Sequence, residues 1–159
     1  MATPVEVLAY VGLGANLGDA PAAVRRALSD LDTLPQTRCV RASSLYRSAP
    51  VDAAGPDFIN AVALLCTTLE PYALLAQLQR LEQIAGRERP WHNAPRTLDL
   101  DLLRYGELRL TDPRLTLPHP RMLQRAFVLF PLAEIAPELV SASQRQAVLG
   151  QAIEKLTGG

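Results

Sequence analysis

Residues 93–101 read Asn-Ala-Pro-Arg-Thr-Leu-Asp-Leu-Asp and are the most informative stretch of this 159-residue chain. Asp99 and Asp101 alternate with leucines at positions 98, 100 and 102. A period of two is typical of a β-strand, which places both carboxylates on one face and the leucines on the other. Neighbouring carboxylates repel each other unless a cation lies between them, and oxygen ligands completed by substrate phosphates suit Mg²⁺. From spacing alone, a strand edge with two solvated acids fits equally well.

The segments around this stretch predict an antiparallel α+β fold. An amphipathic helix is expected after Asp19, which can cap it, and a second one from Glu70-Pro71 to about Gly86. Short apolar runs typical of strands occupy residues 5–13, 37–46, 58–67 and 97–104. The resulting β-α-β-β-α-β order is that of the ferredoxin-like fold, with helices on one face of an antiparallel sheet.

A helical C-terminal extension is expected beyond this core. A turn at Tyr105-Gly106 leads into a short return strand near residues 108–110. Residues 122–135 look mainly helical, with an interruption at Pro131. A last helix is expected, capped by Ser143 and carrying Leu149, Ala152, Ile153 and Leu156 at helical spacing. No repeat or linker is visible, so we expect one domain over residues 1–159.

Composition restricts the class of protein. Apolar residues make up 48% of the chain and charged residues 20%, which is typical of a globular protein. Sixteen basic and sixteen acidic residues cancel, so no general attraction to nucleic acid or to an anionic membrane is expected. No signal peptide or membrane-spanning run is visible. Cys39 and Cys66 are expected to be reduced core thiols of a cytoplasmic protein.

Several polar residues are candidates for ligand contacts. Phe58 and Asn60 share a strand face, where a ring and an amide suit a flat, nitrogen-rich heterocycle, although a core phenylalanine beside a solvated asparagine gives the same pattern. Gln79 and Glu82 lie off the leucine stripe of the second helix, where a solvated polar face is the default. The run Gly-Leu-Gly-Ala-Asn-Leu-Gly-Asp at residues 12–19 matches neither a P-loop nor a dinucleotide fingerprint, so a turn is favoured over a ligand cradle.

Basic residues gather near the acid pair and near one histidine. His119 stands between two prolines and is flanked by Arg114 and Arg125. A second group, Arg87, Arg89 and Arg96, precedes Asp99 in the sequence. In a neutral protein this concentration favours a polyphosphate ligand, although arginines also decorate loops for solubility.

Several blocks together resemble the 6-hydroxymethyl-7,8-dihydropterin pyrophosphokinase family of folate biosynthesis. The block Pro-Arg-Thr-Leu-Asp-Leu-Asp at residues 95–101 is the most specific. The resemblance runs from about residue 7 to residue 140 and includes, in order, residues 12–19, 43–47, 57–61, 95–101, 115–120 and 133–138.

The resemblance implies transfer of a pyrophosphoryl group from ATP to the pterin hydroxymethyl group, with release of AMP. It implies two Mg²⁺ ions held by Asp99 and Asp101, and catalytic roles for these two residues together with Arg87 and Arg96. Members of the family are mostly monomeric and cytoplasmic. The implied pterin site comprises Ser48, Pro50, Phe58, Asn60 and Phe127. The implied ATP site comprises Gln79, Glu82, Arg87, Arg96, Leu102, Arg114, Thr116, His119 and Arg125.

The chain departs from the family pattern before the acid pair. The family often has Arg-Trp-Gly where this chain has His-Asn-Ala at residues 92–94, so no stacking role is carried over to Trp91. Pro120 stands where an aromatic residue is common.

Three other functions fit parts of the pattern. An RNA-binding module shares the element order but needs exposed aromatics and a basic face, whereas aromatics are 5% here and the net charge is zero. Another magnesium-dependent nucleotidyl transferase would release pyrophosphate instead of AMP. A non-catalytic ligand-binding domain would bind but turn nothing over.

Overall fold

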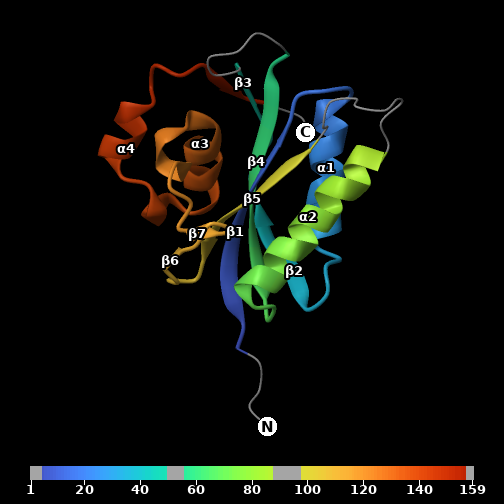
Figure 1. Cartoon of the computed structure of the whole chain (residues 1–159). Helices are drawn as coiled ribbons and strands as arrows, with labels where there is room; N and C mark the ends of the chain where they lie inside the picture. The colour runs from blue at the N-terminus through green and yellow to red at the C-terminus, as the bar shows by residue number, and fades with distance from the viewer. Residues whose placement is uncertain (1–4, 50–55, 88–97, 157–159) are drawn as a thin grey trace.

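An antiparallel sheet with helices on both faces forms the centre of the molecule (Figure 1). The computed structural model describes residues 5–49, 56–87 and 98–156, except for the side chain of Arg87. The strands are β1 (Val7–Ala15), β2 (Thr37–Ala42), β3 (Tyr46–Ser48), β4 (Phe58–Thr67), β5 (Asp99–Tyr105), β6 (Leu110–Thr111), β7 (Thr116–Leu117) and β8 (Ile153–Lys155). The helices are α1 (Ala20–Leu31), α2 (Pro71–Arg87), α3 (Ala126–Ile135) and α4 (Ala142–Ala147), with 3-10 turns η1 (Met122–Gln124) and η2 (Pro137–Leu139).

The strand order of the main sheet is β5-β1-β4-β3-β8, and β2 also pairs with β4. All of these pairings are antiparallel, so the predicted α+β class with an antiparallel sheet is confirmed. The predicted strand at residues 58–67 is β4, with the same bounds. The Asp19 carboxylate caps α1 by accepting a hydrogen bond from the backbone N–H of Ala22 at 3.2 Å.

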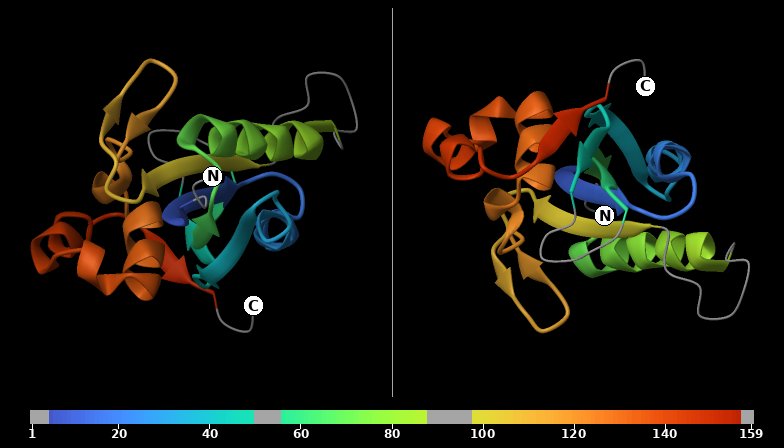
Figure 2. Two further views of the ribbon diagram at one scale, coloured as in Figure 1. Left: turned by 90° about the horizontal axis from the view of Figure 1, so that it is seen from below. Right: turned by 90° about the horizontal axis from the view of Figure 1, so that it is seen from above.

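Each face of the sheet has its own apolar core. On one face, α1 and α2 pack on β1, β4 and β5 through residues such as Val24, Leu78 and Leu100. On the other face, α3 packs on side chains that include Val62 and Leu103. Figure 2 shows the two layers from below and from above. Leu115 and Leu117, in and beside the β6–β7 ribbon, belong to the core under α1 and α2. In the described part of the chain, no helix combines the length and apolarity needed to span a membrane.

The predicted second strand is divided. Residues 37–46 form β2 and the start of β3, and residues 43–45 between them leave the strand conformation. The Ser43 hydroxyl accepts a hydrogen bond from the backbone N–H of Val62, and the Ser43 N–H donates to the Val62 carbonyl, both at 2.9 Å. The Ser43 side chain therefore takes the place of a backbone hydrogen bond between β2 and β3. Both of these strands pair with β4.

The predicted last helix is wrong. The Ser141 side chain, not Ser143, caps α4, which ends at Ala147. Residues 153–155 form β8, which pairs with the edge of β3. The unpaired hydrogen-bonding groups of an edge strand are satisfied by added strands, and this tertiary pairing outweighs the helical spacing of the local sequence.

Two smaller predictions also need correction. The turn at Tyr105-Gly106 is present, but β6 pairs with β7 and does not return along β5. The interruption between residues 122 and 135 falls at Arg125, which separates η1 from α3, whereas Pro131 lies inside the continuous α3.

Candidate active site

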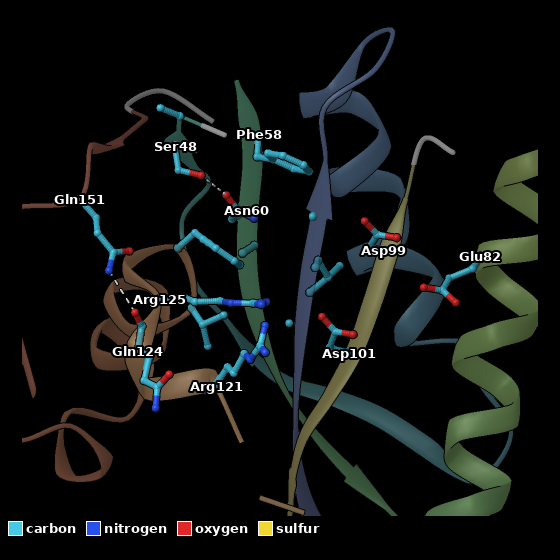
Figure 3. Close-up of a pocket in the computed structure, with 17 residues that line it drawn as sticks. Ser48, Phe58, Asn60, Glu82, Asp99, Asp101, Arg121, Gln124, Arg125 and Gln151 are labelled. Carbon is cyan, nitrogen blue, oxygen red and sulfur yellow. Dashed lines mark hydrogen bonds between the residues drawn. The ribbon is translucent and has the colours of Figure 1, made fainter. Parts of the chain in front are cut away.

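A cavity of about 750 Å³ opens on the α3 side of the sheet (Figure 3). Seven secondary-structure elements and several connecting segments supply its walls. Three of the elements, β5, β1 and β4, are neighbouring strands in the sheet. The lining residues are Gly12, Leu13, Gly14, Ser48, Ala49, Phe58, Asn60, Ala61, Glu82, Asp99, Asp101, Arg121, Gln124, Arg125, Phe127, Val128 and Gln151.

Two glycines of β1 form the floor of this cavity. Gly12 lies opposite Asp101 on β5 and Val62 on β4, and Gly14 lies opposite Asp99 and Asn60. A Cβ atom added at Gly14 would stand 3.1 Å from Nδ2 of Asn60. The prediction of a turn at residues 12–19 is therefore wrong for its first half, because β1 continues to Ala15.

The acid wall comes from β5, as the alternation predicts. Asp99 and Asp101 are exposed and face the cavity, whereas the leucines at 98, 100 and 102 are buried against α1 and α2. Glu82 of α2 accepts a hydrogen bond from the Leu100 N–H at 2.8 Å and thereby fixes the outer edge of β5. This bond places the Glu82 side chain at the rim of the site.

The donor set of this wall fits a hydrated hard cation. Within the described ranges, no group of three or more His, Cys, Asp or Glu side chains is arranged to hold a metal ion. Two carboxylates leave most of a coordination shell to water and to ligand oxygens. This is the manner in which Mg²⁺ binds beside phosphates, and it does not suit zinc.

The wall opposite the aspartates is basic. Arg121 and Arg125 extend from the segment around η1, and their guanidinium groups point into the cavity toward β5 (Figure 3). The Arg125 guanidinium also lies over the Phe127 ring, 5.5 Å from its centroid. Cations on one side and carboxylates on the other suit an anionic ligand bridged to the acids by a metal ion.

A buried polar pair forms the far end of the cavity. The Ser48 hydroxyl of β3 donates to Oδ1 of Asn60 at 2.8 Å, and the two residues are 5% and 4% exposed. This bond fixes the amide orientation, so the Asn60 NH₂ group lies on the side of Gly14. With Phe58 and Phe127 in the same lining, this end offers aromatic faces and polar groups.

His119 links β5 to the segment that carries Arg121 in the basic wall. Its backbone N–H donates to the Leu103 carbonyl at 2.8 Å, and its Nδ1 accepts from the Arg121 N–H at 3.2 Å. Burial lowers the pKa of this imidazole, and the nearby Asp101 carboxylate partly opposes that change. The neutral ring therefore anchors the chain just before Arg121.

The structure brings together eight of the residues predicted for the site: Ser48, Phe58, Asn60, Glu82, Asp99, Asp101, Arg125 and Phe127. Five others do not line the cavity: His119 holds the backbone of Arg121, and Leu102, Gln79, Thr116 and Arg114 lie elsewhere among the described residues. The Leu102 side chain is buried on the opposite face of the sheet, so it cannot contact a ligand in this cavity. Gln79 is exposed on α2, Thr116 lies on β7, and Arg114 stacks on the Tyr72 ring at 5.1 Å.

Some predictions fall outside what the structure describes. These concern Pro50, Arg89, Trp91 and Arg96, together with the side chain of Arg87, whose backbone ends α2.

Sequence reasoning did not assign nine of the lining residues to the site: Gly12, Leu13, Gly14, Ala49, Ala61, Arg121, Gln124, Val128 and Gln151. The glycines carried a usable signal, because they occur at a period of two within an apolar run. Arg121 directly follows the Pro-His-Pro motif. Gln124 and Gln151 had no local signal, since only the tertiary fold brings them to the cavity.

Comparison with known proteins agrees with this geometry. The family model described as 7,8-dihydro-6-hydroxymethylpterin-pyrophosphokinase (HPPK) matches residues 10–137. A relative from Pseudomonas aeruginosa, named 2-amino-4-hydroxy-6-hydroxymethyldihydropteridine pyrophosphokinase, is 49% identical over 131 residues, which cover 82% of this chain and 81% of the relative. A relative of the same name from Synechocystis is 43% identical over 148 residues, which cover 93% of this chain and 75% of the relative.

Solved structures share the fold at low sequence identity. A chain titled HPPK-DHPS in complex with substrates aligns with a TM-score of 0.64 and 13% identity, over 88% of this chain and 42% of that one. A Plasmodium falciparum HPPK-DHPS aligns with a TM-score of 0.62 and 12% identity, over 84% of this chain and 41% of that one. This chain thus spans less than half of those longer proteins. The family model covers most of the chain and the curated relatives share its name, so the chain belongs to the 7,8-dihydro-6-hydroxymethylpterin-pyrophosphokinase family.

Proposed function

We propose that this chain transfers a pyrophosphoryl group from ATP to the hydroxymethyl group of 6-hydroxymethyl-7,8-dihydropterin in folate biosynthesis. The acceptor oxygen forms a bond to the β-phosphorus while the bond from the β-phosphorus to the oxygen bridging the α-phosphate breaks. AMP leaves with that oxygen, and the hydroxyl proton is released. The observation that carries the proposal is one cavity with an acid wall, a basic wall and a buried Ser48–Asn60 pair joined by a glycine floor.

Asp99 and Asp101 are the residues that would hold magnesium. We propose two ions at this wall, in line with the family resemblance. When bound there, magnesium neutralises negative charge on the triphosphate and on the transition state. Both carboxylates project from an edge strand that Glu82 fixes from outside, so little rearrangement is needed to present them.

The arginines hold the phosphates from the opposite wall. Arg121 and Arg125 face the aspartates, and a guanidinium binds phosphate oxygens in a two-pronged geometry. By the family resemblance, Arg87 and Arg96 act on the same phosphates. His119 accepts a hydrogen bond from the backbone N–H of Arg121, so it supports an arginine that holds the phosphates.

The pterin lies at the Ser48–Asn60 end of the cavity. The Asn60 NH₂ group donates to a ring acceptor because the Ser48 hydroxyl occupies the amide oxygen. Phe58 and Phe127 supply aromatic surface for the flat heterocycle. The glycine floor leaves room for the hydroxymethyl group to approach the phosphates.

The protein acts, on this proposal, as a cytoplasmic monomer with one domain over residues 1–159. Neutral net charge and two cysteines away from any paired motif support a cytoplasmic setting.

An assay with ATP, Mg²⁺ and the hydroxymethyl-dihydropterin tests the reaction. AMP that appears only when the pterin is present supports the proposal. Release of pyrophosphate would instead indicate a nucleotidyl transferase, and binding of both ligands without turnover would indicate a non-catalytic domain. Asp101→Asn serves as the matched inactive control for contaminating enzymes.

A further inference from the structure

The C-terminal segment supplies a side chain to the cavity from beyond the family match. The match ends at residue 137, whereas Gln151 lies between α4 and β8. Its side chain is half-buried and lines the cavity beside Gln124 and Arg125 (Figure 3).

The Gln151 amide makes two hydrogen bonds that bracket Arg125. Its Oε1 accepts from the backbone N–H of Ala126 at 2.9 Å, and its Nε2 donates to the carbonyl of Gln124 at 3.0 Å. A neutral amide carries both an acceptor and donors, so a single glutamine satisfies the backbone on both sides of the arginine.

These contacts act at the start of α3, which has no side-chain cap of its own. Arg125 is extended, with φ −120° and ψ 121°, and separates η1 from α3. Its side chain makes no capping hydrogen bond to α3, although the first N–H groups of a helix have no acceptor within the helix. Gln151 supplies that acceptor to Ala126 from a distant part of the sequence.

Gln151 is itself held firmly. Its backbone N–H donates to the carbonyl of Val148 at 3.0 Å, and Val148 is buried in the core under α3. Two residues later, Ile153 begins β8 and pairs with Ser48 of β3. The segment thus connects the basic wall of the cavity to the Ser48–Asn60 end.

We propose that Gln151 is a positioning residue that holds Arg125 and Phe127 in the orientation that binds the nucleotide and the pterin. This inference rests on the proposed function, because it assigns those two side chains to the two substrates. Loss of the amide frees the backbone around Arg125, so the guanidinium and the aromatic ring stacked with it lose their fixed place in the wall.

The test replaces Gln151 by methionine, which keeps the length and apolar stem of the side chain but removes both hydrogen bonds. We expect KM for ATP and for the pterin to rise about five- to twenty-fold, the factor for one or two lost hydrogen bonds, with kcat within about three-fold. The matched control is Gln146→Met, at an exposed position of α4, which should leave both KM values unchanged. Titration with an unreactive ATP analogue and with the pterin gives the same comparison without turnover.

A double-mutant cycle separates positioning from a general effect on folding. In an Arg125→Ala background, Gln151→Met should change affinity for the ATP analogue by less than about two-fold, since the two substitutions act through one contact. A lower melting temperature with unchanged KM values, or an equal loss of affinity in both backgrounds, would overturn the proposal. Failure of the wild type to form AMP would contradict the proposed function alone, because the titrations still measure the role of Gln151; a wild type that binds neither ligand would overturn both.

Discussion

The two faces of the sheet use the same strands for different purposes. On the face toward α1 and α2, β5 presents leucines that are almost fully buried. On the opposite face, the alternate positions of β5 carry Asp99 and Asp101, and β1 carries Gly12 and Gly14. Figure 1 shows α1 and α2 together on one side of the sheet and α3 on the other. A closed face thus provides rigidity, and the open part of the other face provides the site.

This comparison implies that stability and activity separate along β5. Substitutions on the cavity face should change the chemistry with little effect on unfolding. Substitutions on the core face should do the reverse. Asp101→Asn and Leu102→Ala test that separation on neighbouring residues of β5.

Asp101→Asn should have the largest effect. We expect kcat to fall by about 100-fold or more, because the variant loses a charged oxygen ligand where charge must be neutralised. The melting temperature should change little, since Asp101 is exposed and the amide has the same size. AMP formation and thermal unfolding are measured in parallel, with the exposed Glu107→Gln beyond the end of β5 as control. Turnover within three-fold of wild type would refute the assignment of Asp101.

Leu102→Ala should give the opposite result. Leu102 is 3% exposed within the core under α1 and α2, so its truncation should lower the free energy of unfolding by about 2–5 kcal/mol. The kcat and the KM for ATP of the folded fraction should stay close to wild type. Denaturant unfolding and steady-state kinetics measure the two effects. A raised KM without lost stability would restore the nucleotide contact that the family resemblance implies for Leu102.

Gly14→Ala should impair binding of the pterin more than Gly12→Ala. The added methyl group at Gly14 would lie 3.1 Å from Nδ2 of Asn60, which must shift, whereas at Gly12 it would lie 3.5 Å from the Leu103 methyl groups, an ordinary contact. We expect the Kd for the pterin to rise about ten-fold for Gly14→Ala, a cost of about 1.4 kcal/mol, and to change less than about two-fold for Gly12→Ala. Titration with the pterin measures both. Equal effects of the two substitutions would show that the Asn60 contact does not matter.

The part of the fold that follows from local pattern could be predicted. Alternation along residues 98–102 gave both the strand and the division of its faces, because burial of one face of a sheet imposes a period of two. The bounds of β4, the cap at Asp19 and the start of α2 at Glu70-Pro71 were likewise visible, since each depends on residues that are adjacent in the sequence.

The remainder depends on partners that are distant in the sequence. Residues 149–156 carry helical spacing, yet β8 forms because β3 offers an edge to pair with. Gln151 meets the backbone on both sides of Arg125 only in the folded chain, so no local pattern could identify it as part of the site. Glycine usually weakens a strand, so residues 12–19 predict a turn; here the neighbouring strands on both sides hold Gly12 and Gly14 in the sheet.

Glu134→Gln should have the smallest effect. It tests the polar contact between α3 and β3 on the cavity face of the sheet, where hydrogen bonds to Glu134 join the elements. Burial raises the pKa of this α3 carboxylate, but hydrogen bonds from the Tyr46 hydroxyl and from Ser44 outweigh burial, so its pKa lies below the ordinary value. A carboxylate with a lowered pKa stabilises the fold above its pKa in the unfolded chain, about 4.3, and loses that contribution as the pH falls through its pKa in the fold. The variant should therefore be less stable than wild type at pH 7 by less than about 1 kcal/mol, because the carboxylate is partly exposed to water, and the difference should shrink toward pH 3. Denaturant unfolding at both pH values measures the change, and a constant difference would mean that packing, not charge, joins α3 to β3 at this position.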